Sequence, residues 1–244
     1  ICDGIEKVEQ EINITPIPEE DFLKVYVYVI LDHPEYYFLS LSCSYAVDNS
    51  DNAVRIVNLY RDEFDTAEEI KSGFDYIDSR LQPIIDEANK KATTYEKILY
   101  VYDAVKNLYV YEVSEDSFDI YGALVGGKSV CEGYSETFQY ILTKMEITSI
   151  LVNGEIISTD GTPNVPHRWN MLNIDGDWYH FDVTWDDNYN DRTLEYSYFG
   201  LTTEEILNSR LLEDEILTEY DVIEMLRKAR RKQIHNKEES FGSI

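Results

Sequence analysis

Three side chains of this 244-residue sequence could together carry out nucleophilic chemistry on a carbonyl group: Cys131, His167 and Asp182. Such chemistry needs a thiolate that attacks, a base that returns a proton to the leaving group, and a third group that holds the base in the correct tautomer. A cysteine, a histidine and an aspartate in one chain are weak evidence alone. The prediction therefore depends on the elements that position them.

The stretch from 126 to 145, GGKSVCEGYSETFQYILTKM, predicts an amphipathic helix that begins near Cys131. Ser129 and Glu132 have the spacing of a capping box, which places Cys131 in the first turn. The backbone N–H groups of a first turn lack intrahelical partners, and the helix dipole there is positive. The sequence therefore predicts a lowered pKa for the Cys131 thiol.

The alternative for Cys131 is a small apolar side chain packed at a helix start. Three glycines surround it in the sequence: Gly126, Gly127 and Gly133. They indicate a backbone kept uncrowded for a substrate to approach. Cys2 and Cys43 form no C-x-x-C pair, so neither a disulfide framework nor a zinc ribbon is indicated, and Cys43 is expected to be a buried structural thiol.

The run HRWNMLNIDGDWYHFDVTWDD, which starts at His167, predicts a β-hairpin with Asp175-Gly176 as a two-residue turn. In that register Trp169 lies opposite Asp182. Asp182 then becomes the diagonal neighbour of His167 on one face of the sheet. A carboxylate in that place can orient the imidazole.

Other residues in this region are assigned differently. His180 is expected to be a packed or hydrogen-bonded histidine. Trp169 shares the face of His167, and it is either a core residue or a wall of the substrate cleft. The run DDNYND from 186 to 191 begins like a calcium loop but lacks the glycine and the terminal glutamate, so no metal site is expected.

The remaining patterns predict mixed helices and strands. Before residue 66 they are an extended lead-in over 1–16, a helix after Pro18, and a hairpin of strands at 38–47 and 53–60. Next come helices at 66–90, with a kink or break at Pro83, and at 94–109, a loop over 110–125 and a strand at 147–157. The chain then forms a short strand at 197–201, a brief helix capped by Thr202 and Glu205, and a helix from about Thr218 that ends in a basic cluster.

The composition narrows the class of protein. A hydrophobic content of 43% indicates a globular chain, and a net charge of -27 argues against nucleic-acid binding, because a phosphate-tracking surface needs clustered Lys and Arg. No stretch is long and apolar enough to span a bilayer. No cofactor is expected, and the sequence gives no oligomeric state.

Two stretches, GGKSVCEGYSETFQYIL from Gly126 and PHRWNMLNIDGDWYHFDVTWDD from Pro166, resemble the bacterial branch of the transglutaminase-like superfamily. The resemblance covers residues 94 to 200, and DHPEYYF at 32 to 38 is similar to the usual upstream region of the family. It implies a papain-like α+β fold in which the helix that carries the cysteine packs on an antiparallel sheet.

The resemblance also implies roles for individual residues. Cys131 would be the nucleophile, His167 the base and Asp182 the group that orients it. The backbone N–H of Cys131 would be one oxyanion donor. An upstream aromatic residue or glutamine often supplies another, and Tyr111 and Tyr121 are both candidates.

The sequence departs from the family at Arg168 and Ser135, where alanine is common, and at Glu146, where glycine is common. None of these changes removes a catalytic group. The expected function is acyl transfer from peptide or protein amides through a thioester, with hydrolysis favoured. The alternatives are a true transglutaminase that joins glutamine to an amine, and a non-catalytic peptide- or glycan-binding module.

The expected organisation is an N-terminal helix and hairpin region at 1–64 that packs on the core, a transglutaminase-like core at 65–205 and a helical extension at 206–244. The expected partner is a peptide or protein substrate, with cell-wall-associated substrates among the candidates. Many bacterial relatives are exported, so an extracellular or cell-surface location is expected, with the cytoplasm as the alternative.

Overall fold

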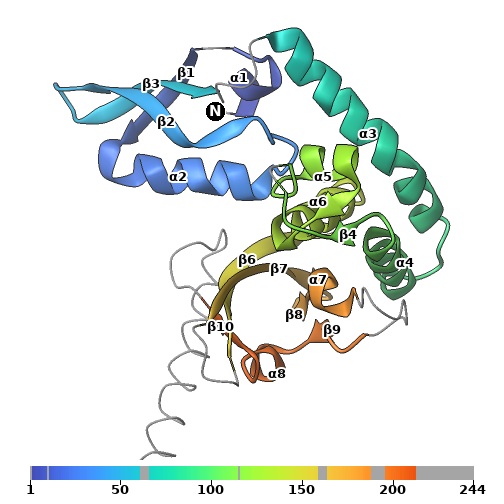
Figure 1. Ribbon diagram of the computed structural model, residues 1–244. Coiled ribbons are helices and arrows are strands. Elements are labelled where there is room, and N and C mark those ends of the chain that lie inside the picture. The colour runs from blue at the N-terminus through green and yellow to red at the C-terminus, as the bar shows by residue number, and fades with distance from the viewer. Residues whose placement is uncertain are drawn as a thin grey trace, which may run out of the picture. The chain divides into compact units, whose positions relative to one another are not determined.

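The computed structural model describes residues 2–9, 11–60, 66–114, 116–158, 164–187 and 196–212 (Figure 1). The chain divides into two compact units, Ile1–Gln82 and Pro83–Ile244, and the division falls inside helix α3, Ala67–Asn89. The domain boundaries expected at 64/65 and 205/206, and the docking of the N-terminal region on the core, stay predictions. The helix expected from Thr218 and its basic cluster lie outside the described residues, as does most of the 206–244 extension.

The first unit contains a three-stranded antiparallel sheet in the order β1-β3-β2, formed by Ile12–Pro18, Ala53–Tyr60 and Leu39–Asp48. The predicted hairpin of β2 and β3 is confirmed, with Tyr45 of β2 opposite Val57 of β3. Cys43 is half-buried and not fully buried, although burial still raises the pKa of its thiol.

Helices α1, α2 and most of α3 also belong to the first unit. Helix α2, Glu19–Asp32, confirms the helix expected after Pro18 despite its β-branched residues, because Phe22, Tyr26 and Leu31 place one apolar face in the core. The extended lead-in predicted for 1–16 is wrong at its start, where α1 occupies Cys2–Glu6. Of the kink or break predicted at Pro83, the break does not occur, because helix α3 continues through this residue.

The second unit begins with α4, Thr94–Lys106, whose capping box is made by Thr93 and Glu96. The loop predicted over 110–125 is wrong in part. The short strand β4, Val110–Tyr111, pairs in parallel with β5, Lys128–Ser129, and α5 occupies Ile120–Gly126 behind an Asp119 cap.

A five-stranded antiparallel sheet in the order β10-β6-β7-β8-β9 forms the centre of the second unit. Its strands are Arg210–Leu212, Ser149–Ile156, Val165–Ile174, Asp177–Phe181 and Phe199–Leu201. The short helices α7, Val183–Asp186, and α8, Thr203–Ile206, lie in the connections. The predicted Asp175-Gly176 turn is confirmed, since Ile174 pairs with Asp177.

Helix α6, Cys131–Lys144, packs on this sheet (Figure 1). Asn170 of β7 donates a hydrogen bond of 3.0 Å to the Ser135 carbonyl of α6, and the rings of Phe138 and Phe181 lie 6.2 Å apart. The prediction of an α+β fold with the cysteine helix on an antiparallel sheet is therefore confirmed. Among the described residues, none of the helices has the length and apolar character needed to cross a membrane.

Gly154 of β6 allows two other elements to approach closely. A Cβ at this position would lie 2.1 Å from the Leu211 carbonyl oxygen of β10 and 2.7 Å from the Trp169 indole. These distances are shorter than van der Waals contact, so a side chain here would push β10 or Trp169 aside. Gly154 therefore lets β10 pair with β6, whose other neighbour is β7, the strand that carries His167.

Glu146, which stands where glycine is common in the family, has a φ of 60° just after the end of α6. A left-handed residue after a helix is usually glycine, because a Cβ costs roughly 1–2 kcal/mol there. Glycine loses more conformational entropy on folding, which offsets about 0.5–1 kcal/mol. We expect Glu146→Gly to stabilise the protein by about 0.5–1 kcal/mol, measured by thermal unfolding. Glu146→Ala keeps the Cβ and is the control, so an equal gain with alanine would contradict the strain explanation.

Candidate active site

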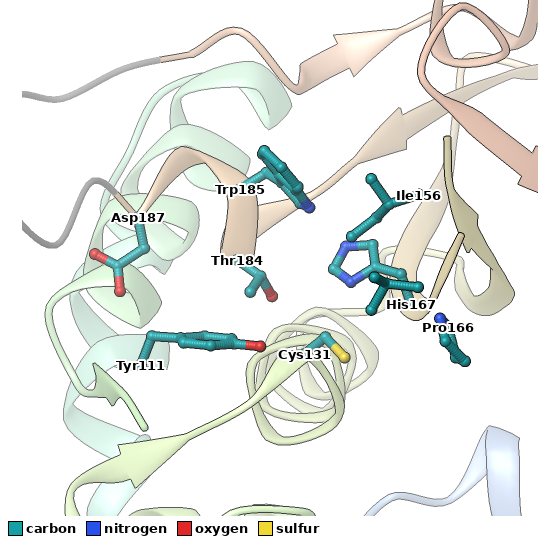
Figure 2. A pocket seen from close by; sticks show the side chains of 9 residues that line it. Tyr111, Cys131, Ile156, Pro166, His167, Thr184, Trp185 and Asp187 are labelled. Atoms are coloured by element: carbon teal, nitrogen blue, oxygen red, sulfur yellow. The ribbon is translucent and has the colours of Figure 1, made fainter. Parts of the chain in front are cut away.

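A pocket of about 350 Å³ in the second unit contains both Cys131 and His167 (Figure 2). Its walls come from β4, the start of α6, facing parts of β6 and β7, and α7. The lining residues are Tyr111, Cys131, Ile156, Val165, Pro166, His167, Thr184, Trp185 and Asp187. The nucleophile and the base predicted from the sequence therefore meet in one largely apolar pocket.

Cys131 is the first residue of α6, as the sequence predicts, but the predicted capping box is absent. The N-cap residue is Val130, which has no capping side chain. Ser129 belongs to β5, and its hydroxyl donates to the Val130 carbonyl at 2.9 Å instead of accepting from the helix. The pairing of β5 with β4 fixes this segment, so the helix start is set by strand pairing.

The predicted low pKa of the Cys131 thiol is wrong. Burial and the adjacent Glu132 carboxylate raise its pKa to about 12, and the thiol donates to Glu132 Oε2 at 3.0 Å. The backbone N–H and the positive charge of Arg168 act in the opposite direction but do not outweigh them. The Cys131 side chain is therefore a protonated thiol at neutral pH.

His167 and Asp182 are joined by a buried hydrogen bond of 2.8 Å between Nε2 and Oδ2. The route to this contact differs from the predicted one. Strand β8 ends at Phe181, and Asp182 is the N-cap of α7, where its Oδ1 accepts from the Trp185 backbone N–H at 3.2 Å. Trp169 and Asp182 are therefore not a strand pair, although the carboxylate still reaches His167.

Asp182 makes a second charged contact, which the sequence analysis missed. Arg210 of β10 donates to Asp182 Oδ2 at 2.8 Å, and the exposed fractions of these two side chains are 1% and 0%. Burial alone would raise the pKa of the carboxyl group, but His167 and Arg210 lower it below its ordinary value. Asp182 therefore remains ionised in a fully buried place.

Two of the three aromatic candidates do not line this pocket. Trp169 is buried in the core cluster under the sheet, and it stacks beside His167 at a ring distance of 5.9 Å. Its N–H donates to His180 Nδ1 at 2.9 Å, so the ring cannot turn outward to form the cleft wall. Tyr121 lies on α5 and is not among the lining residues.

Tyr111 does line the pocket, and its hydroxyl points toward Cys131 (Figure 2). Burial, together with the neighbouring Cys131 and Glu132, raises the pKa of the Tyr111 hydroxyl. The phenol therefore keeps its proton and can donate a hydrogen bond into the pocket. Trp185, which is 46% exposed, is the tryptophan that lines the pocket, whereas Trp169, one of the sequence candidates for the cleft, does not.

His180 is a buried histidine, as predicted, and burial lowers the pKa of its imidazole to about 3. It pairs with Met171 across the hairpin and contacts Thr203 through Nε2 at 3.2 Å. A neutral imidazole that is fully occupied by hydrogen bonds cannot act as the base of this pocket.

The three glycines around Cys131 do not share one purpose. A Cβ on Gly133 would lie 2.3 Å from Ser129 Oγ and 2.9 Å from Ala123 Cβ, so this glycine allows α5 and β5 to pack on α6. Gly127 has a φ of 65° and ends α5 in the left-handed region, with open space beside it, as beside Gly126. The predicted substrate approach at Gly133 is therefore wrong.

The departures at Arg168 and Ser135 are accommodated by local hydrogen bonds. Arg168 donates to Glu136 Oε1 at 3.1 Å and to Asn153 Oδ1 at 2.8 Å. Ser135 Oγ donates to the Cys131 carbonyl at 2.8 Å. Both side chains therefore tie the segments of Cys131 and His167 to neighbouring elements.

The DDNYND run at 186–191 can be described only at its first two residues. Asp186 is buried and accepts from the Tyr102 hydroxyl at 2.6 Å and from the Tyr198 N–H at 3.1 Å. Asp187 lines the pocket and accepts from the Tyr134 hydroxyl. The rest of the run lies outside the described residues.

Comparison with known proteins gives a family match for part of the chain. Residues 82–183, less than half of the sequence, match the model of the transglutaminase-like superfamily. Members of this superfamily are usually cysteine-dependent enzymes. No curated protein matches the sequence.

Two solved structures are similar at low sequence identity. One is described as the crystal structure of a TGase, with 15% identity, a TM-score of 0.41, and coverage of 71% of this chain and 50% of that one. The other is a putative cysteine protease from Cytophaga hutchinsonii, with 15% identity, a TM-score of 0.38, and coverage of 59% and 61%. The chain thus spans half to about three fifths of their lengths.

Proposed function

Because residues 82–183 match the transglutaminase-like superfamily, we propose that this protein is a cysteine-dependent enzyme that cleaves peptide or protein amides through a thioester. One observation carries the proposal. Cys131 begins a helix in the same pocket as His167, and His167 is hydrogen-bonded to a buried, ionised Asp182. These are the three groups that acyl transfer through a cysteine requires.

The raised pKa of Cys131 determines how the first step proceeds. His167 takes the thiol proton as the sulfur attacks the amide carbon, and a carbon–sulfur bond forms. The oxyanion that develops can accept hydrogen bonds from the Cys131 backbone N–H, at a helix start, and from the Tyr111 hydroxyl. The carbon–nitrogen bond then breaks, and His167 gives its proton to the departing amine.

The same groups complete the cycle in reverse order. His167 removes a proton from water, the oxygen attacks the thioester carbon, and the acid leaves as the thiol recovers its proton. Asp182 stabilises the imidazolium in both halves of the reaction but does not itself take the proton. Hydrolysis needs only an open pocket that admits water, and Trp185 and Val165 on the pocket wall are both partly exposed.

Amine transfer is the second candidate, and one observation favours it. The carboxylate of Asp187 lines an otherwise largely apolar pocket in a chain with a net charge of -27, which would attract a lysine-like amine. After acylation both routes share one thioester, and the outcome depends on whether water or the amine attacks it.

The decisive test offers a library of glutamine-containing peptides with and without a labelled primary amine. We expect an acyl-enzyme on Cys131, detected by intact mass and peptide mapping, and release of ammonia or amine without stable incorporation of the label. Cys131→Ala should abolish both signals, and Cys43→Ala, at a half-buried thiol outside the pocket, should leave them unchanged.

Two results would change this assignment. Label incorporation that outruns hydrolysis would make the protein a transglutaminase. Peptide binding without an adduct or turnover, together with a Cys131 that resists thiol-directed probes at every pH, would make it a non-catalytic binding module.

A further inference from the structure

Arg210 is bound to the catalytic carboxylate from an element that lies outside the family match. It is separated from Asp182 by 28 residues and lies on β10, the strand beside β6. Its NH2 group donates to Asp182 Oδ2 at 2.8 Å, which is the same oxygen that accepts from His167 Nε2 at 2.8 Å. The same oxygen atom therefore accepts hydrogen bonds from both the His167 imidazole and the Arg210 guanidinium.

The guanidinium lies against two aromatic rings, which also contact each other. Its central carbon lies 4.8 Å from the ring centre of Trp185 and 4.7 Å from that of Tyr198. A planar guanidinium stacks well on aromatic faces, and its NH1 group also donates to the Ser209 carbonyl at 3.1 Å. Because Trp185 is also a wall of the pocket, Arg210 supports that wall and the carboxylate together.

Stability is a poor explanation for this ion pair. Removing two charges from water is costly, and a buried pair often contributes little compared with apolar side chains of similar volume. Arg210 Nε is buried and has no hydrogen-bond partner among the described residues, which adds to that cost. The pair does, however, fix the orientation and the charge of Asp182.

We propose that Arg210 is a positioning residue of the active site, which holds the Asp182 carboxylate ionised and directed at His167. The inference rests on the proposed function, since it assigns Arg210 a part in the same reaction. Without the positive charge, burial would act on Asp182 with only His167 and the hydrogen bond from the Trp185 backbone N–H to oppose it. The carboxylate would then take up a proton at a higher pH and cease to stabilise the imidazolium.

Other charged or titratable groups also lie near Asp182 and influence its ionisation. Asp186 lies one turn further along α7, and its negative charge opposes ionisation of Asp182. The Tyr102 hydroxyl of α4 donates to the Asp182 backbone carbonyl at 2.9 Å and to Asp186. Burial raises the pKa of Asp186, and Lys106 of α4 acts in the opposite direction without outweighing it. None of these groups is altered by a change at Arg210.

The direct test is a carboxyl carbon-13 NMR titration of Asp182, with its resonance identified by its loss in Asp182→Asn. In the wild type, Asp182 should remain ionised to a pH below the usual range of aspartate. In Arg210→Met, the midpoint should rise by about one to three pH units, because one of two nearby opposite charges is gone. Arg210→Lys keeps a charge and should bring the midpoint back toward the wild-type value.

A matched control separates positioning from simple support of β10. Leu212→Ala removes a buried apolar side chain of the same strand and leaves the Asp182 contacts intact, so its midpoint should equal that of the wild type. A midpoint unchanged by Arg210→Met, or moved equally by Leu212→Ala, would overturn the inference.

A second measurement does not depend on the folding of the single Arg210 variant. If Arg210 acts through Asp182, then adding Arg210→Met to Asp182→Asn should alter the rate of Cys131 alkylation by iodoacetamide by less than about twofold. A further loss of about tenfold would show an independent role and contradict the inference. Failure to detect an acyl-enzyme, with Asp182 titrating as expected, would instead refute the proposed function and leave the ion pair standing.

Discussion

Replacing Asp182 with Asn should lower the rate of amide cleavage by about three to four orders of magnitude, because an amide cannot stabilise the imidazolium as a carboxylate does and can hold His167 in the wrong tautomer. The contact that would change is the 2.8 Å hydrogen bond between Asp182 Oδ2 and His167 Nε2. The measurement is the steady-state rate on the best peptide from the glutamine library. Asp187→Asn, at the carboxylate that lines the pocket, is the control, and an equal loss there would contradict the specific role of Asp182.

The same substitution should also weaken the fold, which the sequence alone did not indicate. An amide at this position would leave the buried Arg210 guanidinium without its carboxylate, and breaking a buried ion pair in this way costs about 3–5 kcal/mol. The double change Asp182→Asn with Arg210→Met removes both charges and should recover much of the free energy of unfolding. Activity should remain lost in the double variant. Activity that returned with stability would show that Asp182 acts only through the fold.

Replacing Glu132 with Gln should make the Cys131 thiol more acidic and faster to alkylate. Apart from burial, the Glu132 carboxylate is the largest cause of the raised thiol pKa, through its charge and through the 3.0 Å hydrogen bond from Sγ. A fall of one pKa unit increases the thiolate fraction tenfold at a pH below the pKa. We expect the iodoacetamide rate of Cys131 at pH 7 to rise by about tenfold or more.

This experiment has internal and external controls. Cys2 and Cys43 lie outside the pocket, so peptide mapping should show their alkylation rates unchanged. Glu146→Gln makes the same chemical change at the other end of α6 and should have no effect on Cys131. If Glu132→Gln slows alkylation or leaves it unchanged, then Glu132 does not hold the thiol proton.

Local patterns predicted the elements of the site well. The amphipathic run placed the start of α6 at Cys131, and Asp175-Gly176 fixed the register of β7 and β8. Both signals depend on neighbouring residues alone, which is why they can be read from a sequence. The same reasoning brought His167 and Asp182 to one place, although it assumed a strand that continues past Phe181.

The features that the sequence did not predict depend on contacts between distant segments. The thiol pKa follows from burial and from the direction of the Glu132 side chain, which the helix-start rule does not contain. Strand alternation made Trp169 a candidate for the wall of the cleft. Its hydrogen bond to His180 and the close approach of β10 at Gly154 instead place its indole in the core. Arg210 gave no local signal, because a single arginine in a three-residue strand has no pattern to recognise.

The position of β10 at the edge of the sheet bears on which length of chain can be studied. A fragment cut at residue 183, where the family match ends, would lack both outer strands, β9 and β10. The backbone N–H and C=O groups of β6 and β8 would then face water in rows, and exposed edges of this kind pair with other chains. We expect such a fragment to aggregate through its sheet while keeping all three residues of the proposed triad, so a fragment made to test that proposal should extend at least to Leu212.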